Sequence, residues 1–268
     1  MVKLSIPKLK RGGIAVGFYD LSKEKRKKLV LKIEQEIAHD LKSGKLESIK
    51  RYASDDDTYI RKNTYLILGR LYRDQQDLRE KILRSLKDLL SEKDEKIRQT
   101  MVYTLSEIGK IDAGEVLGLL EVSLSDEHHS VRNAVIGALK QMGEKNPKPT
   151  LEFAKKFLHH PDPKIRREIV HGIELRGRTH PEDILPILEE LQNDPDRKVR
   201  KTIIHVLGQI SYKKGCLEKV ISALKTWENR GLVEKALREI LYIHKQNERY
   251  SAKSYKEAEE YIEQQFKK

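Results

Sequence analysis

Five arginines recur along the chain at nearly constant spacing, and this regularity limits the possible folds more than any other feature of the sequence. Arg61, Arg98, Arg132, Arg166 and Arg200 are separated by 37, 34, 34 and 34 residues. Each belongs to a segment of one kind: YIRKNTYLILGRL, KIRQTMVYTLSEI, SVRNAVIGALKQM, KIRREIVHGIELR and KVRKTIIHVLGQI. A period of this length indicates a solenoid, in which each unit packs against its neighbours along the chain.

Each repeat is predicted to be a helical hairpin. Counting from the arginine, the apolar positions +4, +7 and +10 fall on one helical stripe. An acid precedes each arginine. We predict that it caps the helix, because a carboxylate accepts hydrogen bonds from the free amides of a helix start. A second amphipathic run lies upstream of each loop, as in LREKILRSLKDLL and ILPILEEL. The predicted caps are Asp57, Asp94, Asp162 and Asp196 at −4 and Asp126 at −6.

The recurring pattern, an aspartate followed four residues later by arginine and then by the apolar stripe, resembles HEAT repeats over about residues 22–230. The resemblance implies an all-α fold, a right-handed α-solenoid of about six to seven HEAT-like hairpins that is curved around a concave inner face. It also implies structural roles for the repeat residues, which would link neighbouring units by hydrogen bonds. The residues concerned are Arg61, Arg98, Arg132, Arg166, Arg200, Asp94, Asp162 and Asp196.

The two ends of the chain differ from the repeats. Residues 1–20 lack helical periodicity and are predicted to form a basic, flexible arm. Residues 21–230 would form the solenoid, and residues 231–268 a pair of capping helices of the same domain.

The charge balance favours an anionic partner. Lys and Arg outnumber Asp and Glu by 54 to 42, a net charge of +12, which suits nucleic acid or an acidic protein surface. No apolar stretch approaches the roughly 18 residues of a membrane span, so no membrane partner is expected. The single cysteine, Cys216, excludes an internal disulfide. A cytoplasmic protein is expected, with a monomer as the predicted state.

Motifs for catalysis or cofactors are weak. His128, His129, His159 and His160 are predicted to be solvent-facing loop residues, since the His-Glu dipeptides of a two-metal hydroxylase are absent. The glycines of RGGIAVG lack the Gly-Lys-Ser/Thr ending of a phosphate loop. Cys216 has no His and acid pattern that would mark a nucleophile. We therefore predict no catalytic residue, no metal and no cofactor.

The second helix of each repeat carries the more informative pattern. Off its buried stripe, positions near +1, +5 and +12 are mostly cationic or aromatic, which predicts a basic inner groove able to follow a phosphate backbone. A solvated polar face without a partner is the alternative interpretation. The predicted nucleic-acid-binding residues are Lys62, Arg73, Tyr103, Lys110, Arg167, His171, Arg176, Arg178, Lys201, His205 and Tyr212.

Arg176 falls at +10, where the other repeats have Leu71, Ile108, Met142 and Ile210. A helix end allows its stem to lie along the seam while the charge reaches outward. Two interpretations stay open. The guanidinium pairs with a carboxylate such as Glu174 or Glu182, or it belongs to the groove together with Arg178.

Residues 164–211, with their Arg-Gly turn, DP loop and VRK helix start, resemble the later repeats of the HEAT-like DNA alkylation repair (alkylpurine DNA glycosylase) family. This resemblance implies a basic concave face that holds duplex DNA, with base excision in the active members. The chain departs from the family in having one tryptophan, Trp227, near its end, so no residue matches the catalytic set. Trp227 is predicted to be a core or end-cap residue.

The leading prediction is a HEAT-repeat protein that binds nucleic acid, with DNA preferred, through phosphate contacts and without catalysis. A protein-interaction scaffold that binds an acidic peptide or partner helix is the alternative. A DNA glycosylase with an altered pocket is the third hypothesis.

Overall fold

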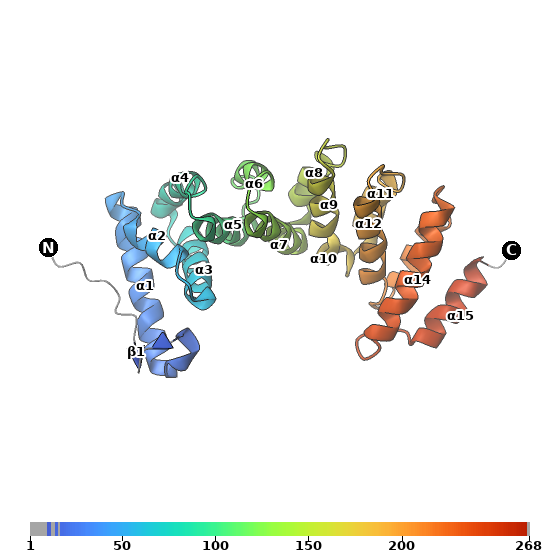
Figure 1. Ribbon diagram of the computed structural model, residues 1–268, viewed down its shortest axis with the longest axis horizontal. Helices are drawn as coiled ribbons and strands as arrows, with labels where there is room; N and C mark the ends of the chain where they lie inside the picture. Colours follow the sequence, from blue (N-terminus) through green and yellow to red (C-terminus); the bar gives the residue numbers. More distant parts are fainter. Residues whose placement is uncertain (1–9, 12–13, 16, 267–268) are drawn as a thin grey trace. The chain divides into compact units, whose positions relative to one another are not determined.

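The structure is a computed structural model that describes residues 10–11, 14–15 and 17–266 of the 268-residue chain. Figure 1 labels the elements where there is room. The chain forms two compact units, Met1–Ile108 and Gly109–Lys268. Most of the predicted N-terminal arm, residues 1–9, 12–13 and 16, lies outside the described residues.

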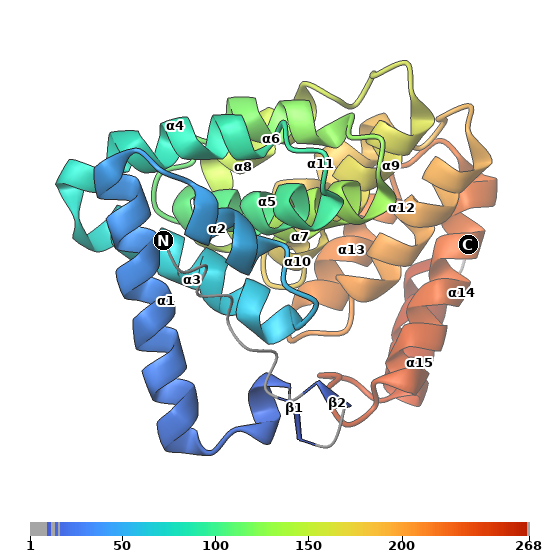
Figure 2. The ribbon, with the colours of Figure 1, turned by 60° about the vertical axis from the view of Figure 1, so that its left-hand side comes forward.

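The first unit is built from helices that follow a short hairpin. Strands β1 and β2 are antiparallel and pair over two residues each. Helix α1 packs against α2 and α3, and α4 packs against α1 and α3, as Figure 2 shows for α1 to α3. The elements are β1 (Lys10–Arg11), β2 (Ile14–Ala15), η1 (Phe18–Asp20), α1 (Lys23–Ser43), α2 (Glu47–Ala53), α3 (Thr58–Asp74), η2 (Gln76–Leu78), α4 (Arg79–Leu89) and α5 (Glu95–Gly109).

The second unit has two layers of helices. One layer is the series α7, α9, α12 and α14, in which each helix packs against the next, and Figure 1 shows them side by side. In the other layer α13 packs against α11 and α15, and α6 and α8 pack against α7. The elements are α6 (Leu117–Leu124), α7 (His129–Lys145), α8 (Pro147–Lys155), α9 (Pro163–Gly172), α10 (Glu174–Gly177), α11 (Pro181–Glu190), α12 (Arg197–Gln209), α13 (Cys216–Leu224), α14 (Arg230–Gln246) and α15 (Tyr255–Phe266). The prediction of an all-helical fold is confirmed, with the two-residue strands as a small addition.

Carboxylates begin most of the arginine-bearing helices as predicted. Asp57, Asp162 and Asp196 are the N-caps of α3, α9 and α12, and Asp94 accepts from the backbone N–H of Lys96 at 2.8 Å. The prediction for Asp126 is wrong. His128 is the N-cap of α7, and Asp126 instead accepts from the N–H of His128, because it lies two residues too early to reach the helix.

The repeat arginines hold the loop that connects the two helices of each hairpin. In all five repeats the guanidinium Nη1 donates to the backbone carbonyls six and five residues earlier, which a bare turn would leave unpaired. Arg166 and Arg132 also contact the following repeat. Arg166 binds both carboxylate oxygens of Asp194, at 2.6 and 2.8 Å, and Arg132 Nε lies 3.5 Å from Glu168 Oε1.

The segment KIRREIVHGIELR is interrupted, unlike the other four. Helix α9 ends at Gly172, and the four-residue α10 begins at Glu174. Gly172 brings α9 close to α7, since a Cβ at this position would lie 2.9 Å from the Leu139 side chain. Glycine has a low helix propensity. Gly172 is thus both the last residue of α9 and the residue that allows close packing on Leu139.

Breaking the buried pair of Arg166 and Asp194 is expected to destabilise the second unit. We expect Arg166→Met to lower the free energy of unfolding by about 3 kcal/mol, because it leaves the carboxylate of Asp194 buried and unpaired. Arg200→Met is the matched control. Among the described residues Arg200 donates only to the carbonyls of Asp194 and Pro195, so the expected loss is about 1 kcal/mol. Urea unfolding measures both, and equal losses would contradict the assignment.

Candidate functional site

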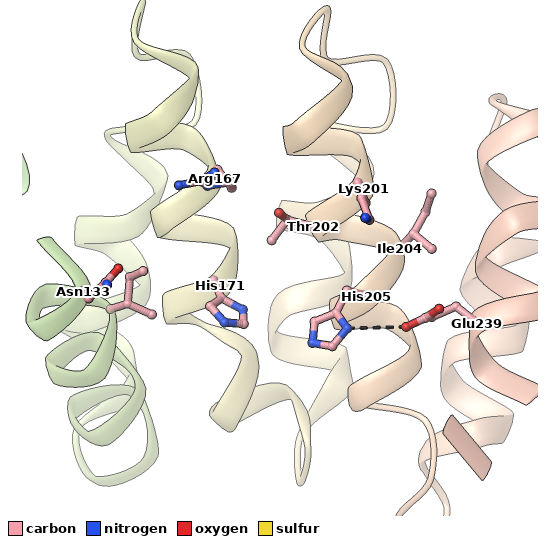
Figure 3. Close-up of a pocket in the computed structure, with 9 residues that line it drawn as sticks. Asn133, Arg167, His171, Lys201, Thr202, Ile204, His205 and Glu239 are labelled. Carbon is pink, nitrogen blue, oxygen red and sulfur yellow. Dashed lines mark hydrogen bonds and ion pairs between the residues drawn. The ribbon is translucent and has the colours of Figure 1, made fainter. Parts of the chain in front are cut away.

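The largest concentration of predicted site residues is in a groove of the second unit, formed by α7, α9, α12 and α14. Its volume is 460 Å³, and Figure 3 shows the side chains that project into it. Four predicted residues, Arg167, His171, Lys201 and His205, come together here. We call this site the cationic groove; its lining is Asn133, Ile136, Arg167, His171, Lys201, Thr202, Ile204, His205 and Glu239.

The cations of the groove are stacked one repeat apart. Arg167 on α9 and Lys201 on α12 occupy the +1 position of their repeats, 34 residues apart. A further 34 residues lead to Lys235 on α14, which lines an adjoining groove of 580 Å³ that shares Lys201 and Ile204 with the first. Within residues 17–266, none of the three side chains has an ion pair or hydrogen bond. They form a row of cations available to a ligand.

Part of the groove wall is apolar. Ile136 and Ile204 line the groove at +4 and are half-buried, whereas Val170 between them in sequence is fully buried. The predicted buried stripe is therefore correct at Val170 and too wide at Ile136 and Ile204, because the +4 position is at the edge of the helix packing. This surface suits the sugar edge of a nucleotide or an aliphatic side chain.

Two imidazoles lie side by side on α9 and α12, as Figure 3 shows, with ring centroids 5.9 Å apart. Each has a carboxylate neighbour. His205 Nδ1 is 3.4 Å from Glu239 Oε1, and His171 Nδ1 is 3.0 Å from Glu174 Oε2. Imidazole nitrogens can donate or accept hydrogen bonds, so both rings add polar atoms to the groove.

Glu174 is almost completely buried, with 2% of its side chain exposed. Lys140 Nζ lies 3.0 Å from its Oε2, and Arg178 Nη2 lies 2.5 Å from its Oε1. Burial alone would raise the pKa of Glu174, but His171, Lys140 and Arg178 outweigh it and lower the pKa to about 2. The carboxylate joins α7, α9 and α10, and its negative charge is balanced by these neighbours.

The two arginines around Gly177, Arg176 and Arg178, are bound by side chains of the same chain. Arg176 Nη2 lies 2.7 Å from Asp183 Oδ2 on α11, so the predicted pairing of Arg176 with a carboxylate is present with a different partner from Glu174 or Glu182. Arg178 donates to Gln209 Oε1 at 2.9 Å as well as to Glu174. Neither lines the cationic groove, because both are held by acceptors from neighbouring elements.

Tyr212 is not brought to the groove. It is 7% exposed, and Lys213 Nζ lies 4.9 Å from its ring centroid, so its ring faces are covered. Tyr212 lies beyond the end of α12 at Gln209, and its side chain is buried in the core. Arg73, in the first unit, is exposed and pairs with Asp74, and Lys110 is half-buried at the start of the second unit.

Lys62 and Tyr103, also predicted site residues, line a separate groove of the first unit. Its volume is 430 Å³. The rings of Tyr65 and Tyr103 lie 5.2 Å apart, centroid to centroid, with an interplanar angle of 37°. We call this site the tyrosine groove; its lining is Thr58, Tyr59, Arg61, Lys62, Tyr65, Gln99, Thr100 and Tyr103.

The remaining candidates have structural environments. Cys216 is buried at the start of α13, and burial raises the pKa of its thiol, the opposite of an activated nucleophile. Trp227 is fully buried, as predicted for a core residue. His159 is exposed and pairs with Glu190, and His128 caps α7. In the described part of the chain, no three His, Cys, Asp or Glu side chains form a group that could hold a metal.

Sequence reasoning missed Lys235 and Glu239 in the second unit and Tyr59 and Tyr65 in the first. The signal for the first two was available, since the 34-residue period carried from Lys201 and His205 reaches Lys235 and Glu239. It was obscured because α14 has Glu234 where a repeat arginine would stand. Tyr65 was assigned to the buried stripe, and Tyr59 precedes the repeat arginine.

Two family models match parts of the chain. Residues 151–239 match the model of HEAT repeats, and residues 39–119 match the model of non-SMC mitotic condensation complex subunit 1. Residues 151–239 are therefore similar to HEAT repeats, as predicted from the recurring arginine pattern. No curated protein matches the sequence.

Solved structures resemble the chain to different degrees. AlkD2 from Streptococcus mutans has a TM-score of 0.53 at 17% identity, over 76% of this chain and 97% of that one. The protein smu.31 from Streptococcus mutans UA159 has a TM-score of 0.45 at 19% identity, over 78% and 96% of the two chains. A Crescerin TOG domain structure has a TM-score of 0.48 at 17% identity, over 69% and 85%. The HEAT-like solenoid predicted from the repeat is therefore confirmed by the AlkD2 fold. Among the described residues, no helix has the length and apolarity needed to cross a membrane.

The charge on Glu174 makes the free energy of unfolding depend on pH in the acid range. Its pKa falls from 4.5 in the unfolded chain to about 2 in the fold, so its contribution is complete above pH 4.5 and is lost as the pH falls toward 2. The contribution is on the order of 3 kcal/mol. We expect the difference in free energy of unfolding between the natural protein and Glu174→Gln to shrink over this range. Glu152→Gln, which removes an exposed carboxylate, is the control and should show a small difference at every pH.

Proposed function

We propose that the protein binds nucleic acid, preferably duplex DNA, by holding a phosphate backbone along the cationic groove of the second unit. The observation that supports this most strongly is the row of Arg167, Lys201 and Lys235. The three cations stand on successive helices, and none has a carboxylate partner among the described residues. Cations left unpaired in a row are the usual means of neutralising phosphates.

The spacing of the row suits a polyanion with regularly placed charges. Packed helices lie about 8–10 Å apart, so successive cations of the row are separated by a similar distance. A phosphate strand supplies charges at closer intervals, and each cation can therefore meet a phosphate without a fixed sequence. Binding of this kind recognises the shape and charge of the backbone more than the bases.

The surrounding acids do not cancel the row. Glu174 and Glu168 are buried against cations from neighbouring helices, and Asp194 is held by Arg166. Glu239 is the acid in the lining of the cationic groove, and it lies next to His205. Thr202 and Asn133 add neutral donors for phosphate oxygens.

The fold likeness to AlkD2 agrees with this proposal. It is the fold that the resemblance of residues 164–211 to DNA alkylation repair proteins implies, and residues 164–211 contain Arg167, His171, Lys201 and His205. The proposal includes no excision step, since the one tryptophan is buried in the core.

The salt dependence of DNA binding tests the row directly. Each lost phosphate contact lowers the slope of log K against log salt by about 0.9. We expect Arg167→Gln, Lys201→Gln and Lys235→Gln combined to reduce this slope by about 2.7 and to weaken binding to a short duplex in fluorescence anisotropy at low salt.

The matched control removes three exposed lysines at α8 and the residue after it: Lys148→Gln, Lys155→Gln and Lys156→Gln. Its change in net charge is the same, and its slope should stay close to that of the natural protein. Equal effects of the two triple variants would refute a localised groove. Tighter binding of an acidic peptide than of DNA, lost in the same groove variant, would favour the scaffold hypothesis instead.

A further inference from the structure

We infer that the tyrosine groove of the first unit binds an unpaired nucleobase, which stacks on Tyr65 and Tyr103 while its phosphate meets Lys62. This site deepens the proposed function and rests on it, because it adds a preference for single-stranded or unpaired DNA to the backbone contacts of the second unit. The two grooves belong to different units and are argued from separate residues.

The aromatic pair provides a binding surface of the right kind. Tyr65 on α3 and Tyr103 on α5 are both half-buried, with their ring centroids 5.2 Å apart. Among residues 17–266, no hydrogen bond to either phenol oxygen is present, so both hydroxyls remain available to the polar edge of a ligand. A surface with apolar faces and polar rims matches the flat shape and polar edge of a base.

Lys62, a cation next to the tyrosines, indicates that the ligand carries a negative charge as well as a flat ring. Lys62 is exposed, has no ion pair among the described residues, and lines the same groove. Gln99 and Thr100 complete a polar wall. A single nucleotide unit has a flat base at one end and a phosphate at the other, so aromatic rings and a lysine satisfy both ends at once.

Tyr59 extends the site and is fixed in place by the residues before α1. It is 43% exposed, its ring meets that of Tyr19 edge to face at 4.3 Å, and the Phe18 ring stacks on it at 6.3 Å. The backbone N–H of Phe18 donates to Asp57 Oδ2 at 2.6 Å, which anchors this cluster at the start of α3. The groove therefore has three tyrosines, one of which is held from outside by other aromatic rings.

A base inside a duplex has both faces covered by its neighbours, so only an unpaired base can offer a face to these rings. The inference is thus a statement about specificity. It predicts that DNA with unpaired bases binds more tightly than DNA with the same number of phosphates but no additional bases.

The experiment compares two duplexes that carry an overhang of about four nucleotides, made of thymidines in one and of abasic spacers in the other. Their phosphates are equal in number, so only the bases differ. We expect the full-length protein to bind the thymidine overhang at least about fivefold more tightly in fluorescence anisotropy. Tyr65→Leu combined with Tyr103→Leu should abolish this ratio, and Tyr65→Phe with Tyr103→Phe should keep it because the rings remain.

Tyr250→Leu, which removes an exposed tyrosine of the second unit, is the matched control and should keep the ratio. Equal affinity of the natural protein for the two overhangs overturns the inference even if the leucine variant does not fold. In that case, blunt-duplex binding that still requires Arg167, Lys201 and Lys235 leaves the proposed function intact. Absence of binding to every DNA would overturn both.

Discussion

The hydrogen bonds from each repeat arginine to the two carbonyls before its helix are the constraint on which the rest of the structure depends. They tie the interhelical loop to the start of the following helix in the same way in all five repeats. Since the loops are held alike, side chains at one repeat position recur in equivalent places. The alignment of Arg167 with Lys201 and of His171 with His205 follows from this regularity, so a structural residue determines where the proposed binding residues lie.

The electrostatics of the second unit follow from the division between buried and exposed charge. Carboxylates on the packed side, such as Glu168 and Glu174, are almost inaccessible and have cations from adjacent helices. Buried pairs of this kind add less to stability than their number suggests, because desolvation offsets much of the attraction. Glu168 and Glu174 also do not line the cationic groove, whose lining contains Glu239 as its acid.

Much of the fold was predictable from the sequence, because the arginine period, the caps and the apolar stripe are local signals. The positions of individual side chains were less predictable. Tyr212 fits the pattern at +12 but turns into the core after α12 ends, and the partner of Arg176 depends on where α11 packs. Helix α9 ends at Gly172, whose close approach to Leu139 is a contact across helices that no local pattern contains. For the candidate sites, the +1 and +5 positions predicted the cationic groove, whereas the apolar Ile136 and Ile204 in its wall required the packing of neighbouring helices.

The unpaired state of Arg167, Lys201 and Lys235 has a consequence for the protein without a ligand. Three like charges on consecutive helices repel one another, and the repeats that carry them are packed together at the expense of that repulsion. This repulsion is present in the folded protein, and an anion bound along the row, as proposed, would reduce it. Evolution toward a more stable protein would first introduce carboxylates into this row, and each one would weaken the surface that the row creates.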